Sequence, residues 1–480
     1  MILTPLNLEV RYNMNFEKNY NNLLKQMNVN PEKKSLKNNI DKNTPLFPFK
    51  SRTEDTATFE NGFYSVLGEF SRILLNKKLD DSLNIKDIIA ESKNNENFDI
   101  ETESEDYLEK LVKEYLFNEK DELKIINPYL FLYLPLSNNK KSKGEKSIAL
   151  FLRDVFFRDN KNLINFFNNK ETNNLLIKLV LKNIPELTDN KTDFKYDCMI
   201  DSISELFNDD IDYLCKYEQY FIKNIDKVFA YYYFFYISQL VLKINRGFND
   251  NKEIDELYYL LDWESASKNR KAVKKGYRFL TDKTASLFTK VSLIDQMNTL
   301  LGTHDLLEKD MLIYYEKLNY TEQREFLKYL KKWICVYKYY NDFDLTKSSE
   351  EEYLYDLSDN FKDLMNELFV TLNDKEHGNN PEPKSRYAIN LKNIAKKYFI
   401  KRRGSYGYTL NMNREILIVL TALCVKDKKI RLTQLFDEYE KRGIYFDIQS
   451  KEEIIKLLTQ LNLIDKKSDS GDAQYVKPIL

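Results

Sequence analysis

Apolar residues recur at helical spacing along most of the chain. From Ile148 to about Asn341 one amphipathic segment follows another, with breaks near Pro185, 249–251 and Gly302. Glycine and proline are scarce, at 11 and 10 of 480 residues, and turn-rich β-sandwiches and propellers need many such residues. The pattern therefore predicts a mainly α fold of multi-helical domains, without an internal repeat.

Changes of composition divide the chain into four consecutive ranges. Residues 1–55 contain Asn and Lys clusters with Pro31, Pro45 and Pro48 and suggest an N-terminal arm or docking segment. Helical domains would then fill 56–376, followed by a linker and basic helix at 377–404, because 376–385 (EHGNNPEPKS) combines Gly and Pro. In 405–480 the expected order is helix, short strand, helix, helix and hairpin, which is typical of a winged-helix-like domain.

Two apolar stretches need separate interpretation. Residues 125–136 (IINPYLFLYLPL) are interrupted by Pro128 and Pro135, so they are either a short buried strand or a helix entry. Residues 228–244 (VFAYYYFFYISQLVLKI) are shorter than a membrane span and contain polar residues, so they predict a buried core helix. With no secretory signal in view, we expect a cytoplasmic protein without membrane contact.

Motifs for catalysis are missing from the sequence. It lacks the phosphate-binding pattern G-x-x-x-x-G-K-[ST] and the dinucleotide pattern G-x-G-x-x-G, so we expect no NTP hydrolysis by this chain and no cofactor. The two His and four Cys residues lack metal-site spacing, and the cysteines fit buried reduced thiols. Glu-x-Lys, a nuclease element, occurs four times, as often as chance gives, and 122–124 is the best placed. No residue is therefore predicted to be catalytic or to bind a metal.

Two acid-free basic stretches stand out because the net charge of the chain is only −1. In 384–403 (KSRYAINLKNIAKKYFIKRR), Leu391, Ile394, Ala395, Tyr398 and Phe399 fall at helical spacing and predict an amphipathic helix docked by one face. The charged residues of this helix would face solvent or a polyanion: Lys392, Lys396, Lys397, Lys401, Arg402 and Arg403. The second stretch, 265–278, has six basic residues: Lys268, Arg270, Lys271, Lys274, Lys275 and Arg278.

Each basic stretch has two possible roles. It could contact DNA phosphates, or it could pair with the acidic helices expected at 96–122 and 349–376. Base reading by the third helix of the C-terminal domain, 450–462, is less expected, because that helix is neutral and offers only Lys451, Lys456 and Gln460.

Two segments, 274–303 (KKGYRFLTDKTASLFTKVSLIDQMNTLLGT) and the tail 429–480, resemble the DptG family. This family is the middle component of the bacterial phosphorothioation-dependent DNA restriction machinery. The resemblance implies an anti-phage complex in which DptF-like and DptH-like partner subunits use NTP, while this chain is a non-ATPase subunit. It carries over no catalytic residue. We therefore expect contacts to double-stranded DNA through phosphates, with a nuclease of unrecognised active site, activated in the complex, as the alternative.

Overall fold

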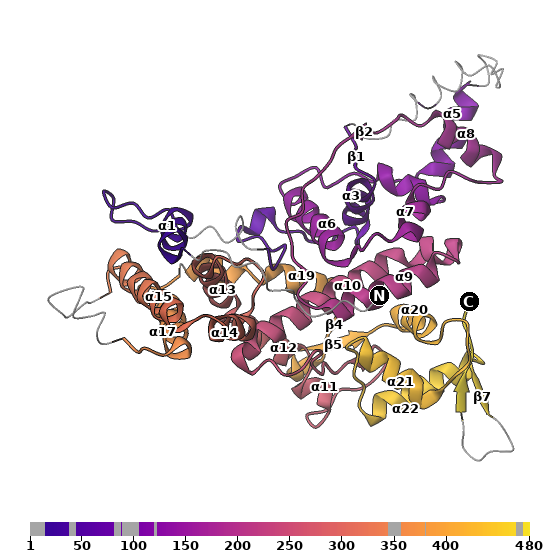
Figure 1. Cartoon of the computed structure of the whole chain (residues 1–480). Helices are drawn as coiled ribbons and strands as arrows, with labels where there is room; N and C mark the ends of the chain where they lie inside the picture. The colour runs from indigo at the N-terminus through magenta and orange to yellow at the C-terminus, as the bar shows by residue number, and fades with distance from the viewer. Residues whose placement is uncertain are drawn as a thin grey trace. The chain divides into compact units, whose positions relative to one another are not determined.

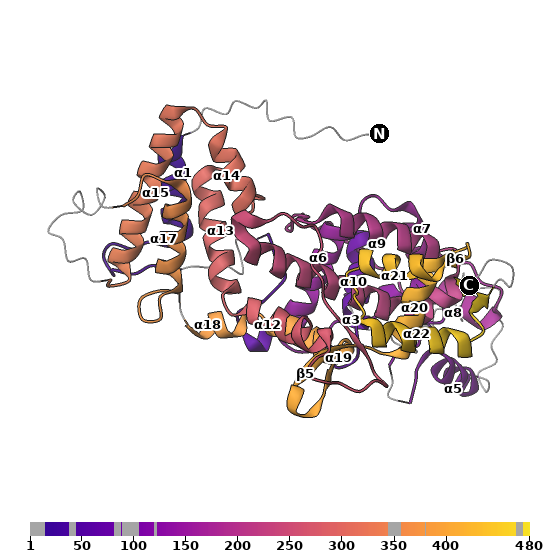
Figure 2. The same cartoon turned by 90° about the horizontal axis from the view of Figure 1, so that it is seen from below.

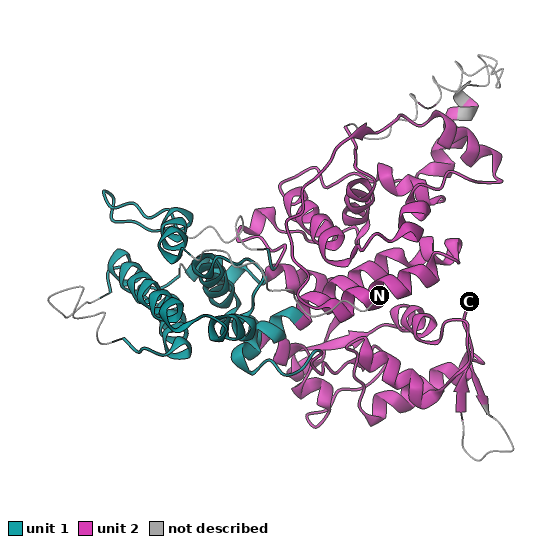
Figure 3. Ribbon diagram, in the orientation of Figure 1, with its two compact units in different colours: residues 1–46, 240–253, 283–388 teal, residues 47–239, 254–282, 389–480 magenta. Residues whose placement is uncertain are grey.

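The computed structural model describes residues 15–37, 45–80, 88, 105–119, 122–343, 357–379, 381–466 and 474–480. These residues are mainly helical with a few short strands, which confirms the predicted fold class (Figure 1). The chain forms two compact units built from separate segments (Figure 3). Unit 1 comprises 1–46, 240–253 and 283–388, and unit 2 comprises 47–239, 254–282 and 389–480. The four ranges predicted from composition are consecutive, whereas long-range packing joins distant segments within each unit.

Unit 1 is a group of helices around α13 (Leu287–Leu301), a helix buried on nearly all sides. Helix α1 (Phe16–Gln26) lies against α13 and α15, so the range 1–55 includes a packed helix. The indole Nε1 of the buried Trp333 donates a hydrogen bond of 2.9 Å to Gln296 Oε1 inside this core. The other elements are η4 (Gly247–Asn249), α14 (Glu308–Glu316), α15 (Tyr320–Tyr340), α17 (Phe361–Asn373) and α18 (Pro381–Arg386).

Unit 2 contains the remaining helices and the β-strands. Its N-terminal part has η1 (Thr53–Asp55), α3 (Tyr64–Leu74), β1 (Lys77–Lys78), α5 (Glu105–Leu116), η3 (Pro128–Tyr133), α6 (Ser142–Phe156), α7 (Lys161–Phe167), α8 (Leu175–Asn183), β2 (Thr188–Asp189) and α9 (Asp201–Leu214). The apolar run 125–136, for which the sequence allowed a short strand or a helix entry, thus contains the buried 3₁₀-helix η3. The later part has β3 (Leu260–Leu261), α11 (Lys271–Lys274), α19 (Ile389–Tyr398), β4 (Ile400–Arg402), η5 (Gly404–Tyr406) and β5 (Tyr408–Met412).

Helices α10 (Glu218–Arg246) and α12 (Tyr277–Thr284) each cross the boundary between the units. The aromatic residues of α10 are buried, as predicted for 228–244, and Tyr233 packs against Phe59, Phe63 and Phe151. Within the described residues, no helix has both the length and the apolarity that crossing a lipid bilayer requires. None of the four cysteines forms a disulfide bond; Cys335 and Cys424 are buried, and the other two are half-buried.

The C-terminal region of unit 2 has the predicted order of elements. It consists of α20 (Arg414–Val425), β6 (Ile430–Arg431), α21 (Leu432–Lys441), α22 (Ile448–Gln460), β7 (Ile464–Lys466) and β8 (Gln474–Val476), and the antiparallel sheet has the order β6-β8-β7. Asn413 caps α20, with its Oδ1 accepting from Ile416 N at 2.8 Å. Helix α22 begins earlier than predicted, because Asp447 rather than Ser450 is its N-cap. Residues 467–473, which include the turn expected for the predicted hairpin, lie outside the described residues.

A buried ion pair joins this C-terminal region to the helices of the same unit. Arg442 and Asp210 are 1% and 0% exposed, and their side chains form two hydrogen bonds, of 2.9 Å from Nε and 2.7 Å from Nη2. Tyr232 of α10 also donates to Asp210, and Glu438 accepts from Arg442 Nη1 at 2.9 Å. A buried charge pair is stable only when its remaining polar atoms are also satisfied, and these neighbours supply that.

Candidate nucleic-acid interface

The sheet β3-β5-β4 brings the two predicted basic stretches together in unit 2. Strand β3 precedes the stretch 265–278 and pairs in parallel with β5, with Leu260 opposite Asn411 and Leu261 opposite Met412. Strand β4 is part of the stretch 384–403 and pairs with β5 in antiparallel fashion. Helix α11 also contacts β5, so segments about 130 residues apart in sequence are neighbours (Figure 1).

The predicted helix over 384–403 is partly wrong. Helix α19 ends at Tyr398, and Lys401 and Arg402 belong to β4. Tertiary pairing decides this, because Ile400, Lys401 and Arg402 lie opposite Leu410, Thr409 and Tyr408 in a hairpin. Its turn has glycines with positive φ at 404 and 407, and in Figure 2 the turn projects away from the helices of unit 2.

The α19 part of the first stretch is amphipathic, as predicted. Leu391, Ile394, Ala395 and Phe399 are buried, and Tyr398 is half-buried. On the other side, Lys392, Lys396 and Lys397 are exposed. Lys397 Nζ donates to the carbonyl oxygen of Glu60 at 2.8 Å, whereas Lys392 and Lys396 have no hydrogen bond or ion pair with any described residue.

The three basic residues at the end of this stretch differ in their surroundings. Arg402 is exposed and has no partner among the described residues. Lys401 is exposed too, but its Nζ donates to the carbonyl oxygen of Asp262 at 2.8 Å. Arg403 is half-buried, and its guanidinium donates to the carbonyl oxygens of Glu264 at 2.6 Å and Leu261 at 2.8 Å. Arg403 therefore fixes the hairpin to the segment after β3, while Arg402 remains accessible.

Five of the six basic residues in the second stretch are exposed. Lys268, Lys274 and Arg278 have no partner in the described part of the chain. Lys271 Nζ lies 3.3 Å from Tyr258 Oη, and Lys275 Nζ lies 3.3 Å from Glu256 Oε2. Both of these contacts are at the surface and leave the ammonium groups open to a further ligand.

Arg270, the sixth residue, is buried in an ion-pair cluster. Its guanidinium donates to Asp447 Oδ2 at 2.6 Å, to Glu264 Oε2 at 2.8 Å and to Ser450 Oγ at 2.8 Å. Burial raises the pKa of Glu264, although Arg270 and Ser450 both donate hydrogen bonds to it. Arg270 thus holds the segment after β3 against the start of α22, and its charge is already neutralised within the protein.

In the described part of the chain the acidic helices form no ion pair with either stretch, although Lys384 Nζ donates to Asn373 Oδ1 at 2.6 Å. Helix α5 covers 105–116 of the first acidic segment, and α17 covers 361–373 of the second, and no ion pair links either helix to the basic stretches. Glu367 of α17 instead pairs with Lys338 at 2.5 Å within unit 1. Glu350, Glu351 and Glu352 lie outside the described residues.

Two candidates for base reading on α22 are engaged with acidic side chains. Lys451 Nζ lies 3.2 Å from Glu440 Oε1, and Lys456 Nζ lies 2.6 Å from Glu453 Oε1. Both pairs are partly exposed, so they are weak, but they reduce the positive charge that α22 presents. The exposed basic residues of 265–278 and 384–403, around β4 and α11, form the basic surface. Its excess of positive charge is much clearer than that of α22.

The aromatic side chains on this surface were not among the site residues predicted from the sequence. Trp263 follows β3, Tyr406 lies in the hairpin turn, and Tyr408 begins β5, with exposures of 43%, 40% and 44%. The position of Tyr406 and Tyr408 in an acid-free segment, and of Trp263 just before the stretch 265–278, was visible in the sequence. Their exposure was not, because most aromatic residues of this chain are buried.

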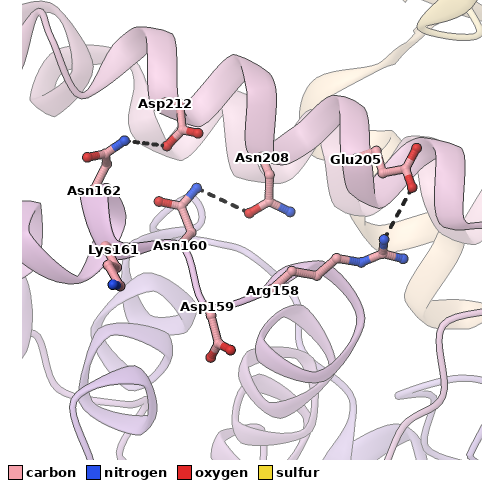
Figure 4. A pocket seen from close by; sticks show the side chains of 8 residues that line it. All are labelled: Arg158, Asp159, Asn160, Lys161, Asn162, Glu205, Asn208 and Asp212. Carbon is pink, nitrogen blue, oxygen red and sulfur yellow. Dashed lines mark hydrogen bonds and ion pairs between the residues drawn. The ribbon is translucent and has the colours of Figure 1, made fainter. Parts of the chain in front are cut away.

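A polar hollow in unit 2 bears on the nuclease alternative (Figure 4). It has a volume of about 390 Å³ and contains the carboxylates Asp159, Glu205 and Asp212 with Lys161. Figure 4 shows these carboxylates spread along the hollow: Glu205 pairs with Arg158 at 3.3 Å, and Asp212 accepts from Asn162 at 2.8 Å. The described residues include no group of three His, Cys, Asp or Glu side chains that could hold a metal ion. A metal-dependent nuclease site would need such convergence.

No protein-family model matches this chain, and no curated protein matches it closely enough in sequence to be a relative.

Proposed function

We propose that this chain is a DNA-contacting, non-ATPase subunit of a phosphorothioation-dependent restriction complex. One observation carries the DNA contact. The sheet β3-β5-β4 connects two acid-free segments, and six exposed basic side chains of these segments have no partner among the described residues: Lys268, Lys274, Arg278, Lys392, Lys396 and Arg402. A polyanion supplies the missing negative charge, and phosphates bound by Lys and Arg release condensed counterions.

The restriction role rests on the resemblance of 274–303 and 429–480 to the DptG family. In this proposal, DptF-like and DptH-like partners in the cytoplasm provide NTP hydrolysis, and this chain holds the duplex. We also propose that 405–480 forms a winged-helix-like domain. The order helix, strand, helix, helix and hairpin, together with the sheet order β6-β8-β7, supports that assignment.

Phosphate contacts should make binding of duplex DNA sensitive to salt and indifferent to sequence. The test compares Lys392→Ala/Lys396→Ala/Arg402→Ala with the intact protein over a range of salt concentrations. Each lost phosphate contact flattens the slope of log K against log salt by about 0.9, so the triple variant should flatten it by up to about 3.

A matched control removes three exposed lysines that have no partner in the described residues, Lys178, Lys182 and Lys223. This control should keep the original salt slope, although it loses the same charge. Equal slopes for the intact protein and the Lys392/Lys396/Arg402 variant would contradict the proposed DNA contact. Co-purification with the DptF-like and DptH-like partners tests the assembly separately.

A further inference from the structure

We infer that the basic surface also binds unpaired nucleotides, by stacking bases on Trp263, Tyr406 and Tyr408. This inference rests on the proposed function and specifies the kind of DNA that the surface recognises. Single-stranded nucleic acid is typically bound by a basic groove for the backbone, together with aromatic side chains on which bases stack. The described surface has exposed basic side chains and exposed aromatic rings close to each other in sequence.

Two of the three aromatic side chains, Tyr406 and Tyr408, lie in an acid-free basic segment, whereas Trp263 lies between Asp262 and Glu264. Trp263, Tyr406 and Tyr408 are each at least 40% exposed. No Asp or Glu occurs in 265–281 or 383–414, the segments that follow Trp263 and contain both tyrosines. Aromatic rings with arginine are also common at protein interfaces, but the acid-free segment around Tyr406 and Tyr408 favours a polyanionic ligand.

The cross-strand register places a charge next to a ring. Arg402 of β4 lies directly opposite Tyr408 of β5, so the two side chains are on the same face of the sheet. A nucleotide whose base stacks on Tyr408 would therefore have a guanidinium within reach of its phosphate. Tyr277 contacts Tyr408 edge-to-face, with ring centroids 6.3 Å apart, and supports its orientation.

Trp263, Tyr406 and Tyr408 form the proposed stacking platform, and Arg403 holds this platform in place. Arg403 donates to the carbonyl oxygens of Leu261 and Glu264, which lie on either side of Trp263 in sequence. Its backbone N–H donates to the carbonyl oxygen of Gly407 at 2.7 Å and closes the hairpin turn. The Arg403 side chain therefore connects the segment around Trp263 to the hairpin that contains Tyr406 and Tyr408. Because these residues are already ordered, less conformational entropy is lost when a ligand binds.

Stacking distinguishes unpaired from paired DNA, because the base faces of a duplex are already covered by their neighbours. The chain has two tryptophans, and Trp333 is fully buried whereas Trp263 is exposed. A change of tryptophan fluorescence on binding therefore reports mainly on Trp263, because the buried Trp333 contributes a background that the ligand does not reach. The test titrates the full-length protein with single-stranded oligothymidine and with a duplex of the same length, and follows fluorescence and a separate binding signal.

The single strand should quench the fluorescence of the intact protein, and Trp263→Phe should bind with little quenching. Each base stack contributes about a fivefold or larger factor to affinity, so Tyr406→Ala/Tyr408→Ala should bind the single strand at least about 25-fold more weakly. Duplex binding by this variant should change less than about twofold. Tyr406→Phe/Tyr408→Phe keeps the rings and should bind the single strand normally.

A control variant changes two exposed tyrosines outside the surface, Tyr107→Ala/Tyr320→Ala, and should bind like the intact protein. If the intact protein binds both DNA forms and the Tyr406/Tyr408 alanine variant weakens neither, stacking is overturned while the phosphate contact stands. If the intact protein binds neither form, the stacking inference and the proposed function both fail. Capture of a protein ligand by the same rings, without DNA binding, would also overturn the inference.

Discussion

Arg270 shows that residues of one type within a single basic stretch can have opposite roles. Lys268 is exposed and has no partner in the described part of the chain, whereas Arg270, two residues later, is 7% exposed and pairs with Glu264 and Asp447. Both were predicted to contact DNA. In the structure, Arg270 instead forms ion pairs within the protein. Only the exposed residues of the stretch remain available to a ligand.

The prediction at this scale compares Arg270→Met with Lys268→Met. Loss of Arg270 leaves the buried carboxylate of Glu264 uncompensated, so the free energy of unfolding should fall by about 3–5 kcal/mol. Lys268→Met should change it by less than about 0.5 kcal/mol, since Lys268 is an exposed residue without a partner. Urea denaturation of the two variants and the intact protein measures this. Equal stability of both variants would show that the Arg270 cluster is not a structural anchor.

At the scale of elements, α1 and α13 are joined by a buried carboxyl group. Gln26 Nε2 donates to Asp295 Oδ2 at 2.7 Å, and Thr299 Oγ1 donates to Gln26 Oε1 at 2.7 Å. Asp295 is 7% exposed and has no ion pair within the described residues. Burial raises the pKa of Asp295 to about 7, although the hydrogen bond from Gln26 lowers it.

This raised pKa predicts that unit 1 loses stability as the pH rises. Above pH 3.8 the unfolded chain releases the Asp295 proton, but the folded unit keeps it until about pH 7. The folded state therefore binds more protons in this range, and the free energy of unfolding decreases from pH 4 to pH 7. Asp295→Asn should remove this part of the dependence and stabilise unit 1 at pH 8 by up to about 4 kcal/mol. Denaturation of both proteins at pH 5 and pH 8 measures the difference, and parallel pH profiles would contradict the assignment.

Elements with a strong local signal were predicted well. The aromatic stretch 228–244 forms part of the buried helix α10, and the order of elements in the C-terminal region matches because caps and apolar periodicity are local. Strand β4 was missed, since its residues continue a helical pattern and form a strand only through pairing with β5. The burial of Arg270 and the exposure of Trp263 depend on distant segments, so no local pattern could indicate them.

At the scale of the whole molecule, the C-terminal region is part of a larger unit. Arg442 follows α21 and Asp210 belongs to α9, and their buried pair links segments more than 200 residues apart. Unit 2 should therefore unfold cooperatively, with the C-terminal region included.

Arg442→Leu should lower the free energy of unfolding by about 3–5 kcal/mol, because Asp210 would remain buried without its main partner. Asp210→Leu/Arg442→Leu removes both charges and should recover much of this loss. Chemical denaturation of the two single variants and the double variant forms a double-mutant cycle. Purely additive effects would show that the pair does not couple the two parts of unit 2.

The parallel pairing of β3 with β5 also determines when the sheet can form during synthesis. Residues 260–261 leave the ribosome long before residues 411–412, their partners in the sheet. Contacts between such distant residues form late, after the cost of closing a long loop has been met. The nascent chain therefore cannot assemble the β3-β5-β4 sheet until β5 has emerged. Synthesis itself would delay nucleic-acid binding until most of the polypeptide exists, and a product that stops before residue 408 would lack the platform.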